Sequence, residues 1–408
     1  METIHAPRQR TLLLIAMIVF IDVASIGLII PVLPSLIGGL ANVSVDRAAA
    51  IGGWLLFSFA VMQFSFAPII SGLSDHYGRR PVLLITLAAL GVDYALMAWA
   101  PTLFWLFVGR IISGVMGATW PAANSCIADA VTPEERGRAF GLLGGAGASG
   151  FVLGPAIGGF FGQFGDRVPF LFASGLCLVG AGIGYFILTE TLPPEKRRAF
   201  TLARANPLGN VIQMAKTPLV LGLLIAIFFM QLGSQSQYSV WAYYGIEKFR
   251  WTTIEIGLTV TLFGVLLAVM QGGLVGPVIA RFGEVRTASI SLLFSIPSYL
   301  ILAFATSTWH MVLGIIVGSV TGLAFPAMQS LMTARIDEDA QGELQGAIAS
   351  MISLTSIVGP VVMTGVFGAY ADEIGPYFPG APFILASGLL TVAIVIVWRT
   401  LKRHTETR

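Results

Sequence analysis

The chain has 408 residues, of which 56% are hydrophobic and only 11% charged, and its mean hydropathy is +0.84. A soluble domain of average composition carries about 25% charged residues, so this composition excludes an ordinary soluble protein. The net charge is only +2, and the basic residues stay near the ends of apolar runs, so the sequence does not indicate nucleic-acid binding.

Twelve apolar runs follow one another along the chain, each near the 20 residues that cross a bilayer as a helix. Strands of a membrane barrel would be about 10 residues long and alternate in polarity, and no such alternation is present. The expected spans are 11–33, 50–71, 81–99, 102–125, 139–162, 168–188, 217–241, 254–277, 286–305, 309–332, 343–366 and 381–399. The predicted class is therefore an all-α, polytopic membrane protein.

Glycines and prolines recur at an interval of 205 residues, which divides the chain into two similar halves of six spans. The recurring pairs include Gly154-Pro155 with Gly359-Pro360, Pro121 with Pro326, Gly109 with Gly314 and Gly117 with Gly322. We expect an N-terminal half over 1–189, a cytoplasmic linker over 190–216 and a C-terminal half over 217–408. Repeated halves of this kind are typical of transporters that rock one half against the other.

The basic residues predict the orientation in the membrane. Of the 23 Lys and Arg residues, 18 fall on one side, four on the other and Arg110 within a span. The positive-inside rule makes the richer side cytoplasmic, so we expect an inner-membrane protein with both termini in the cytoplasm. The first run has no small-residue cleavage site and is interpreted as a span, not a signal peptide. Cys126 and Cys177 lie in spans, so we expect buried thiols without a disulfide.

Two acids and one base lie within the spans of the first half. Asp22 is about a dozen residues into the first span, Asp93 is in the middle of the third, and Arg110 is in the fourth. A buried carboxylate costs about 2.5–3.5 kcal/mol on insertion scales, which makes function the default interpretation; a side chain that reaches the interface is the alternative for Asp22. A cation beside such acids lowers the cost of burying each, and protonation changes that balance.

The loop after the second span, residues 71–81, reads SGLSDHYGRRP. Gly78 permits a sharp turn, Arg79 and Arg80 obey the inside rule, and Asp75 is placed to cap a neighbouring helix N-terminus. A reduced copy, RFGEVR, occupies 281–286. A plain charged turn is the simpler interpretation, but the fixed spacing and the copy favour a specific latch between helices.

The fifth span contains small residues at a spacing of four, in the string GFVLGPAIGG. Such residues let helix backbones approach closely, and the proline bends the helix. Ordinary membrane-helix packing is the competing interpretation. The residues concerned are Gly150, Gly154, Pro155, Gly158 and Gly159.

Four glutamines in spans are candidates for substrate binding. Gln63 lies in the second span, Gln231 and Gln235 lie four apart in the seventh, and Gln271 lies in the eighth. Neutral amides are suited to a substrate cavity, and equally to hydrogen bonds that join helices. The residues leave both interpretations open.

Across nearly its whole length the sequence resembles the tetracycline-type branch of drug:proton antiporters in the major facilitator superfamily. The matching strings are DVASIGLIIPVLP, SDHYGRRPVLL, VDYALMA, GRIISGVMGAT, IADAVTPEERGRAFG, FGVLLAVMQGGLVGPVIARFGE and QGELQGAIASMISLTSIVGP. The resemblance implies that the 71–81 loop locks the outward-facing state, with Asp129 as the partner of Arg79, and that the glycine string marks an antiporter. It also implies proton coupling or substrate binding by the polar residues in spans, which are Asp22, Gln63, Asp93 and Arg110.

Two positions depart from that branch. Its tetracycline exporters carry a histidine in the eighth span and an aspartate in the ninth, which fall at Leu267 and near Ser295 here. The two missing groups are associated with drug–metal and proton handling, so their loss argues against tetracycline itself as the substrate. Proton coupling is still expected, because Asp22 and Asp93 remain.

These observations predict a monomeric secondary transporter that exports an amphipathic drug in exchange for protons, without enzyme activity, cofactor or metal. A proton symporter or facilitator for a metabolite has the same fold and is the alternative; a membrane receptor is the third class. The offset of 205 places Ile227, Ser298 and Ile315 at the counterparts of Asp22, Asp93 and Arg110. We therefore expect proton coupling in the first half and substrate choice in the second, with Gln231, Gln235 and Gln271.

Overall fold

The computed structural model describes residues 5–117, 119–197, 214, 217–337, 340–372 and 375–406. Within these ranges the secondary structure is helical, and no β-strand occurs. Eleven helical stretches are long and apolar enough to cross a membrane. One of them, Thr253–Ala303, has 51 residues and bends at Gly283, so it comprises two of the expected spans. The all-α, membrane-spanning class is confirmed. Most of the linker, at 198–213 and 215–216, lies outside the described residues.

The described residues form two compact units. The first comprises 1–42, 58–205 and 252–261, and the second comprises 43–57, 206–251 and 262–408. Two helices contribute to both units: α3 (Val45–Tyr77) and α11 (Thr253–Ala268). Each unit is described by itself below.

Besides these shared helices, the described part of the first unit contains six long helices and three short ones. Their bounds are α1 (His5–Ile29), α2 (Leu33–Ala41), α4 (Arg79–Ala98), α5 (Leu103–Met116), α6 (Thr119–Ala130), η1 (Pro133–Glu135), α7 (Arg136–Gly162), α8 (Val168–Ile187) and η2 (Pro194–Lys196). The first span ends earlier than the sequence predicted. Residues 30–32 form a turn before α2, because Pro31 and Pro34 cannot donate the hydrogen bonds that would continue α1.

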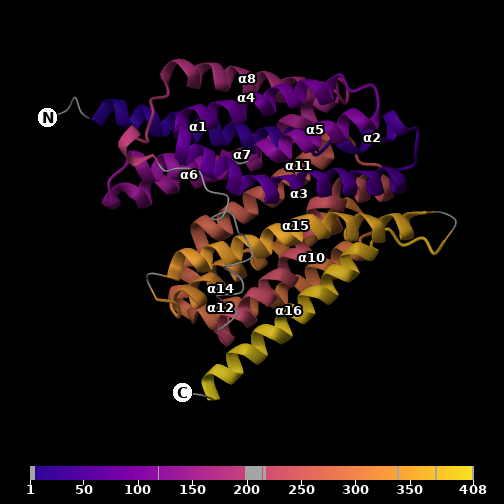
Figure 1. The fold of residues 1–408 in the computed structure, drawn as a ribbon. Helices are drawn as coiled ribbons and strands as arrows, with labels where there is room; N and C mark the ends of the chain where they lie inside the picture. Colours follow the sequence, from indigo (N-terminus) through magenta and orange to yellow (C-terminus); the bar gives the residue numbers. More distant parts are fainter. Residues whose placement is uncertain are drawn as a thin grey trace. The chain divides into compact units, whose positions relative to one another are not determined.

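The second unit is built in the same way. Its helices are α10 (Pro218–Phe249), η4 (Val269–Leu274), α12 (Val275–Ala303), α13 (Thr308–Ser319), η5 (Val320–Leu323), α14 (Ala324–Thr333), α15 (Gln341–Ala371) and α16 (Ala381–Glu406). The packing follows the sequence repeat. In the first unit α1 packs on α7 and α4 on α8; in the second, α10 packs on α15 and α12 on α16 (Figure 1).

Repeated glycines mark equivalent points of the two units. Gly78 begins α4 with a φ of 111°, and Gly283 bends α12 with a φ of 76°. Both values are in the left-handed region that glycine tolerates best. The fourth span breaks at Gly117, between α5 and α6, and the tenth changes to a 3₁₀ turn, η5, around Gly322. The glycine repeat therefore marks places where membrane helices are interrupted.

One segment of the repeat has changed length. The string AVMQ at 60–63 recurs at 268–271, but the next proline follows five residues after Gln63 and six residues after Gln271. The interval between Gln271 and this proline overlaps η4, which is a π-helix. A π-helix has wider i→i+5 hydrogen bonding and accommodates one additional residue, and such segments are frequent at functional sites.

Candidate functional site

The first unit holds a buried acid–base pair. Asp93 on α4 is completely buried, and its Oδ2 accepts a hydrogen bond from the Ser113 hydroxyl of α5. The same oxygen lies 3.7 Å from Nη2 of Arg110, one turn before Ser113 on that helix. The other carboxylate oxygen, Oδ1, is buried and has no hydrogen-bond partner among the described residues. One oxygen of this carboxylate is therefore held by two side chains, and the other is buried without a hydrogen-bond partner among the described residues.

Gly109 makes room for this carboxylate. A Cβ at Gly109 would lie 2.6 Å from Asp93 Oδ1 and 2.7 Å from Cγ of Met97. Met97 also accepts a hydrogen bond from Nη2 of Arg110, at 3.3 Å, and the guanidinium lies 5.7 Å from the ring centre of Phe59. The guanidinium is therefore enclosed on several sides and directed at Asp93.

Asp22 of α1 belongs to the same region of the first unit. Its carboxyl lies near the Thr119 hydroxyl, whose Oγ1 is buried and has no hydrogen-bond partner among the described residues. Asp22, Asp93 and Arg110 all lie within electrostatic range of the buried Tyr94. No ion pair to Asp22 is found within the described part of the chain. The structure thus gathers the three ionisable residues expected from the sequence around one tyrosine.

The loop at 71–81 forms a network around Arg79. Its Nε donates to Oδ2 of Asp129 at 2.9 Å, and its Nη1 forms an ion pair with Asp75. The side chain of Arg79 is 10% exposed. A guanidinium with several fixed acceptors is held in one orientation, because the planar group cannot rotate without breaking its hydrogen bonds to them. The expected contact between Arg79 and Asp129 is present.

The cap on α4 comes from a different acid than expected. Asp75 pairs with Arg79, and the carboxylate that accepts from the start of α4 is that of Glu190. Its Oε1 lies 2.9 Å from the backbone N of Arg79, and its Oε2 lies 3.3 Å from that of Arg80. A side chain at Gly78 would collide with this carboxylate. Arg80 also donates to the Tyr185 carbonyl at 2.5 Å, which ties α4 to α8.

The glycine string of α7 is a packing surface against α1. A Cβ at Gly150 would lie 2.7 Å from the Phe20 carbonyl oxygen, and one at Gly154 would lie 2.6 Å from that of Ala24. Gly158 is closer still, and its Cβ would overlap the backbone of Leu28. Pro155 contacts Gly27, and the Gly159 carbonyl accepts from the Thr253 hydroxyl at 3.0 Å. The motif fixes how closely α7 approaches its neighbours.

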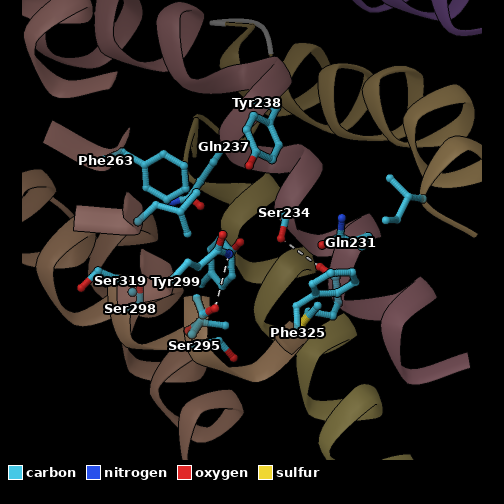
Figure 2. A pocket seen from close by; sticks show the side chains of 17 residues that line it. Gln231, Ser234, Gln237, Tyr238, Phe263, Ser295, Ser298, Tyr299, Ser319 and Phe325 are labelled. Carbon is cyan, nitrogen blue, oxygen red and sulfur yellow. Dashed lines mark hydrogen bonds between the residues drawn. The ribbon is translucent and has the colours of Figure 1, made fainter. Parts of the chain in front are cut away.

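The second unit contains a cavity of about 190 Å³ between α10, α11, α12 and the interrupted tenth span. Figure 2 shows Tyr238 and Phe263 at one end and Ser295 at the other. The polar lining is formed by amides and hydroxyls, namely Gln231, Ser234, Gln237, Tyr238, Gln271, Ser295, Ser298, Tyr299, Ser319 and Thr321. Both positions where the sequence departs from the tetracycline exporters, Leu267 and Ser295, line this cavity.

The glutamines divide between the two roles that the sequence left open. Gln231 and Gln271 line the cavity, whereas Gln235 packs on Gly359 of α15. In the first unit, Nε2 of Gln63 donates to the Gly117 carbonyl at 2.9 Å. In the second, Nε2 of Gln271 donates to the Gly322 carbonyl at 3.4 Å. The same glutamine–glycine bridge therefore spans the helix break in each unit, and it is longer in the second.

Sequence reasoning missed Ser113, Glu190, Gln237 and Thr321. Ser113 had a signal, because it lies one turn after Gly109 and three residues after Arg110 on one helix. Glu190 stands at the start of the polar linker and was assigned to it. Nothing in the local pattern distinguishes Gln237 or Thr321 from other residues of their spans. Within the described ranges, no group of three or more His, Cys, Asp or Glu residues could hold a metal, and both cysteines are free and buried.

Comparison with known proteins identifies the architecture. The sequence model described as Major Facilitator Superfamily matches residues 12–271 and 223–408. The chain belongs to the major facilitator superfamily. The crystal structure of a bacterial homolog of the human lysosomal transporter Spinster has the same fold, with a TM-score of 0.79 and 16% identity, over 97% of each chain.

Within the superfamily, the chain is similar to the tetracycline resistance protein of class C from Escherichia coli. The two are 37% identical over 386 residues, which cover 95% of this chain and 96% of that protein. The class E protein from Escherichia coli is 35% identical over 394 residues, 95% of each chain. The resemblance inferred from the sequence is confirmed: the chain is a multi-pass drug exporter of the tetracycline-resistance type and not an enzyme.

Proposed function

We propose that this superfamily member exchanges protons for an amphipathic drug, with the protons handled in the first unit and the drug bound in the second. One observation carries the proposal. Asp93 has one carboxylate oxygen held by Ser113 and Arg110 and the other left without a partner. Oδ1 of Asp93 can accept a proton while Oδ2 keeps its contacts with Ser113 and Arg110. Buried ionisable residues in membrane helices mark proton relays.

Asp22 is the main proton carrier in this proposal, and Asp93 is the second. Asp93 lies 3.7 Å from a fixed cation, which favours its charged form. Asp22 has the Thr119 hydroxyl beside it and no ion pair within the described residues, so it changes protonation without breaking a salt bridge. The attraction between Arg110 and Asp93 depends on whether Asp93 is ionised or protonated. Protonation of Asp93 therefore changes the contact between α4 and α5.

The drug binds in the cavity of the second unit. Membrane transporters place their sites at interrupted helices, and this cavity lies against the π-helix η4 and the 3₁₀ turn η5. Gln231 and Gln271 supply amides, and Tyr238 and Phe263 supply aromatic surface with ring centres 6.2 Å apart. A tetracycline-like molecule is one member of the class that such a lining suits.

The remaining parts complete an alternating-access cycle. The halves 1–189 and 217–408 move as bodies, joined by the linker at 190–216. Arg79 and its acidic partners form the cytoplasmic gate, together with Gly78 and Arg80, and the glycine face of α7 guides the motion. We place the protein in the bacterial inner membrane as a monomer. Both termini lie in the cytoplasm in this proposal, because the basic residues gather on that side.

The test is uphill drug accumulation by inside-out vesicles that carry the full chain. Asp22→Asn should abolish accumulation driven by a proton gradient, while passive exchange of drug across the protein persists. Asp337→Asn, at an exposed residue, is the control and should behave like the parent. Full proton-driven accumulation by Asp22→Asn would refute the assignment of the carrier. Movement of drug and protons across the vesicle membrane in the same direction would make the protein a symporter.

A further inference from the structure

The cavity of the second unit differs from the rest of the polar interior in its charge. Seventeen residues line it, and none of those described there is Asp, Glu, His, Lys or Arg. The proton-handling region of the first unit, in contrast, is built on two acids and an arginine. The two regions therefore suit different chemical species.

The Asp, Glu, His, Lys and Arg residues of α10 and α12 lie well away from the cavity lining along each helix. On α10, the first such residue after Tyr238 is Glu247, nine residues further along the helix. On α12, Arg286 precedes Ser295 by the same number of residues. Nine residues correspond to about 13 Å of helix. A charged ligand in this cavity would therefore lack a counter-charge on these two helices, and its desolvation would be uncompensated.

The cavity instead offers neutral hydrogen-bonding atoms that are not fully used. The hydroxyl of Thr321 is buried and finds no partner among the described residues. Gln271 is exposed, and its bond to the Gly322 carbonyl, at 3.4 Å, is near the long limit for such a bond. Buried polar atoms are normally paired, so a ligand with neutral polar groups would complete the pairing.

The same lining offers a divalent metal chelate no ligand of the preferred kinds. Hard divalent cations prefer carboxylate oxygens, and transition metals prefer imidazole or thiolate. The lining provides none of these, and the positions of Leu267 and Ser295 are occupied by an apolar group and a hydroxyl whose Oγ already bonds the Leu292 carbonyl at 2.5 Å.

We propose that the cavity of the second unit binds an uncharged, metal-free molecule, so that exchange of this molecule for protons is electrogenic. This inference rests on the proposed function. Each proton that enters carries one positive charge, and the departing molecule carries none. Net charge equal to the number of protons therefore crosses the membrane in each cycle, and the membrane potential drives export as well as the pH gradient does.

The first experiment measures equilibrium binding to the purified full chain. Four probes cover the alternatives: chloramphenicol, which is uncharged; ethidium, a permanent cation; and tetracycline with EDTA or with excess Mg²⁺. We expect binding by chloramphenicol, and at least tenfold weaker binding by ethidium. Metal-free tetracycline, which is a zwitterion without net charge near neutral pH, should bind at least tenfold more tightly than its Mg²⁺ chelate. Tighter binding of either charged probe would overturn the inference. Failure of all four would instead overturn the proposed function.

A matched pair of variants tests whether this cavity is where the protein discriminates between charged and uncharged ligands. Gln271→Glu is isosteric and adds one negative charge at an exposed lining residue, and it should strengthen ethidium binding relative to chloramphenicol at least tenfold. Gln163→Glu adds the same charge at an exposed residue of the first unit and should leave the ratio unchanged. Equal ratios in the two variants would show that this cavity does not select by charge.

The second experiment measures charge movement in proteoliposomes without a pH gradient, with the uncharged probe that binds. A potassium diffusion potential, negative on the side that the probe leaves, should drive its accumulation on the opposite side. A potential of 100 mV should change the limiting concentration ratio by about 50-fold for each proton exchanged. Transport that follows a pH gradient but ignores the potential would refute electrogenic exchange and leave drug:proton antiport intact.

Discussion

The carboxylate of Glu190 accepts a hydrogen bond from the backbone N–H of Arg79, with 2.9 Å between Oε1 and N. The first residue of the linker therefore caps α4, the helix whose first residue, Arg79, holds the latch together. The next two backbone N–H groups of its own chain, those of Thr191 and Leu192, also reach this carboxylate, each at 3.0 Å. The beginning of the linker is thus attached to the latch.

Replacing Glu190 should weaken both the helix start and the latch. Glu190→Ala leaves the first N–H groups of α4 without their acceptor, and loss of a helix cap costs about 1 kcal/mol. We expect a lower melting temperature of the purified protein and slower transport. Glu195→Ala removes an acid from the same segment and should change neither quantity. Equal melting temperatures for the two variants would contradict a capping role for Glu190.

The contact between α1 and α7 predicts opposite results for two glycines of one helix. Gly158→Ala places a Cβ into the backbone of Leu28 and should destabilise the protein by about 1–3 kcal/mol. Gly145→Ala meets nothing within 4 Å and should be neutral or stabilising by up to about 1 kcal/mol. Thermal unfolding in detergent measures both. A stable, active Gly158→Ala would show that the close approach is not required.

Breaking one glutamine–glycine bridge should mainly affect stability, and breaking the other should mainly affect substrate binding. Gln63→Ala breaks the 2.9 Å bond to Gly117 and should lower stability by about 1 kcal/mol, with little change in drug affinity. Gln271→Ala breaks a longer bond at the cavity, so it should change drug affinity and leave stability nearly unchanged. Melting temperature and equilibrium binding, measured on both variants, test the assignment. Reversed effects would place the substrate site in the first unit.

Asp166 provides a pH-dependent test outside the membrane spans. Burial raises the pKa of its carboxyl above the ordinary value of 3.8, and interaction with the Ser35 hydroxyl opposes this shift. The folded state then binds the proton more tightly than the unfolded state, so ionisation of Asp166 reduces stability as the pH rises.

We therefore expect Asp166→Asn to be more stable than the parent at neutral pH. The difference should shrink as the pH falls through the raised pKa of Asp166 and approaches 3.8. Melting temperatures of the purified proteins across this range measure it, with Asp337→Asn at an exposed residue as the control. A difference that grows in acid would contradict the sign of the effect.

The sequence predicted the helical spans well, because length and hydropathy alone determine what a bilayer accepts. It also pointed to Asp22, Asp93 and Arg110, since ionisable residues are rare in such spans. The sequence did not predict which side chains contact one another or face the cavity. Whether Gln231 or Gln235 faces a cavity depends on how α10 is rotated against α15 and α12, and this rotation is fixed by packing between distant segments. Glu190 could not be paired with Arg79 for the same reason, because 111 residues separate them.

The glutamine–glycine bridges of Gln63 and Gln271 occupy the same place in the two units, where each spans the interruption of a membrane helix. The two bridges now differ: the bond from Gln63 is 2.9 Å long and the bond from Gln271, at the π-helix η4, is 3.4 Å long. One duplicated contact therefore serves as a firm joint in one unit and as a looser one beside the cavity in the other.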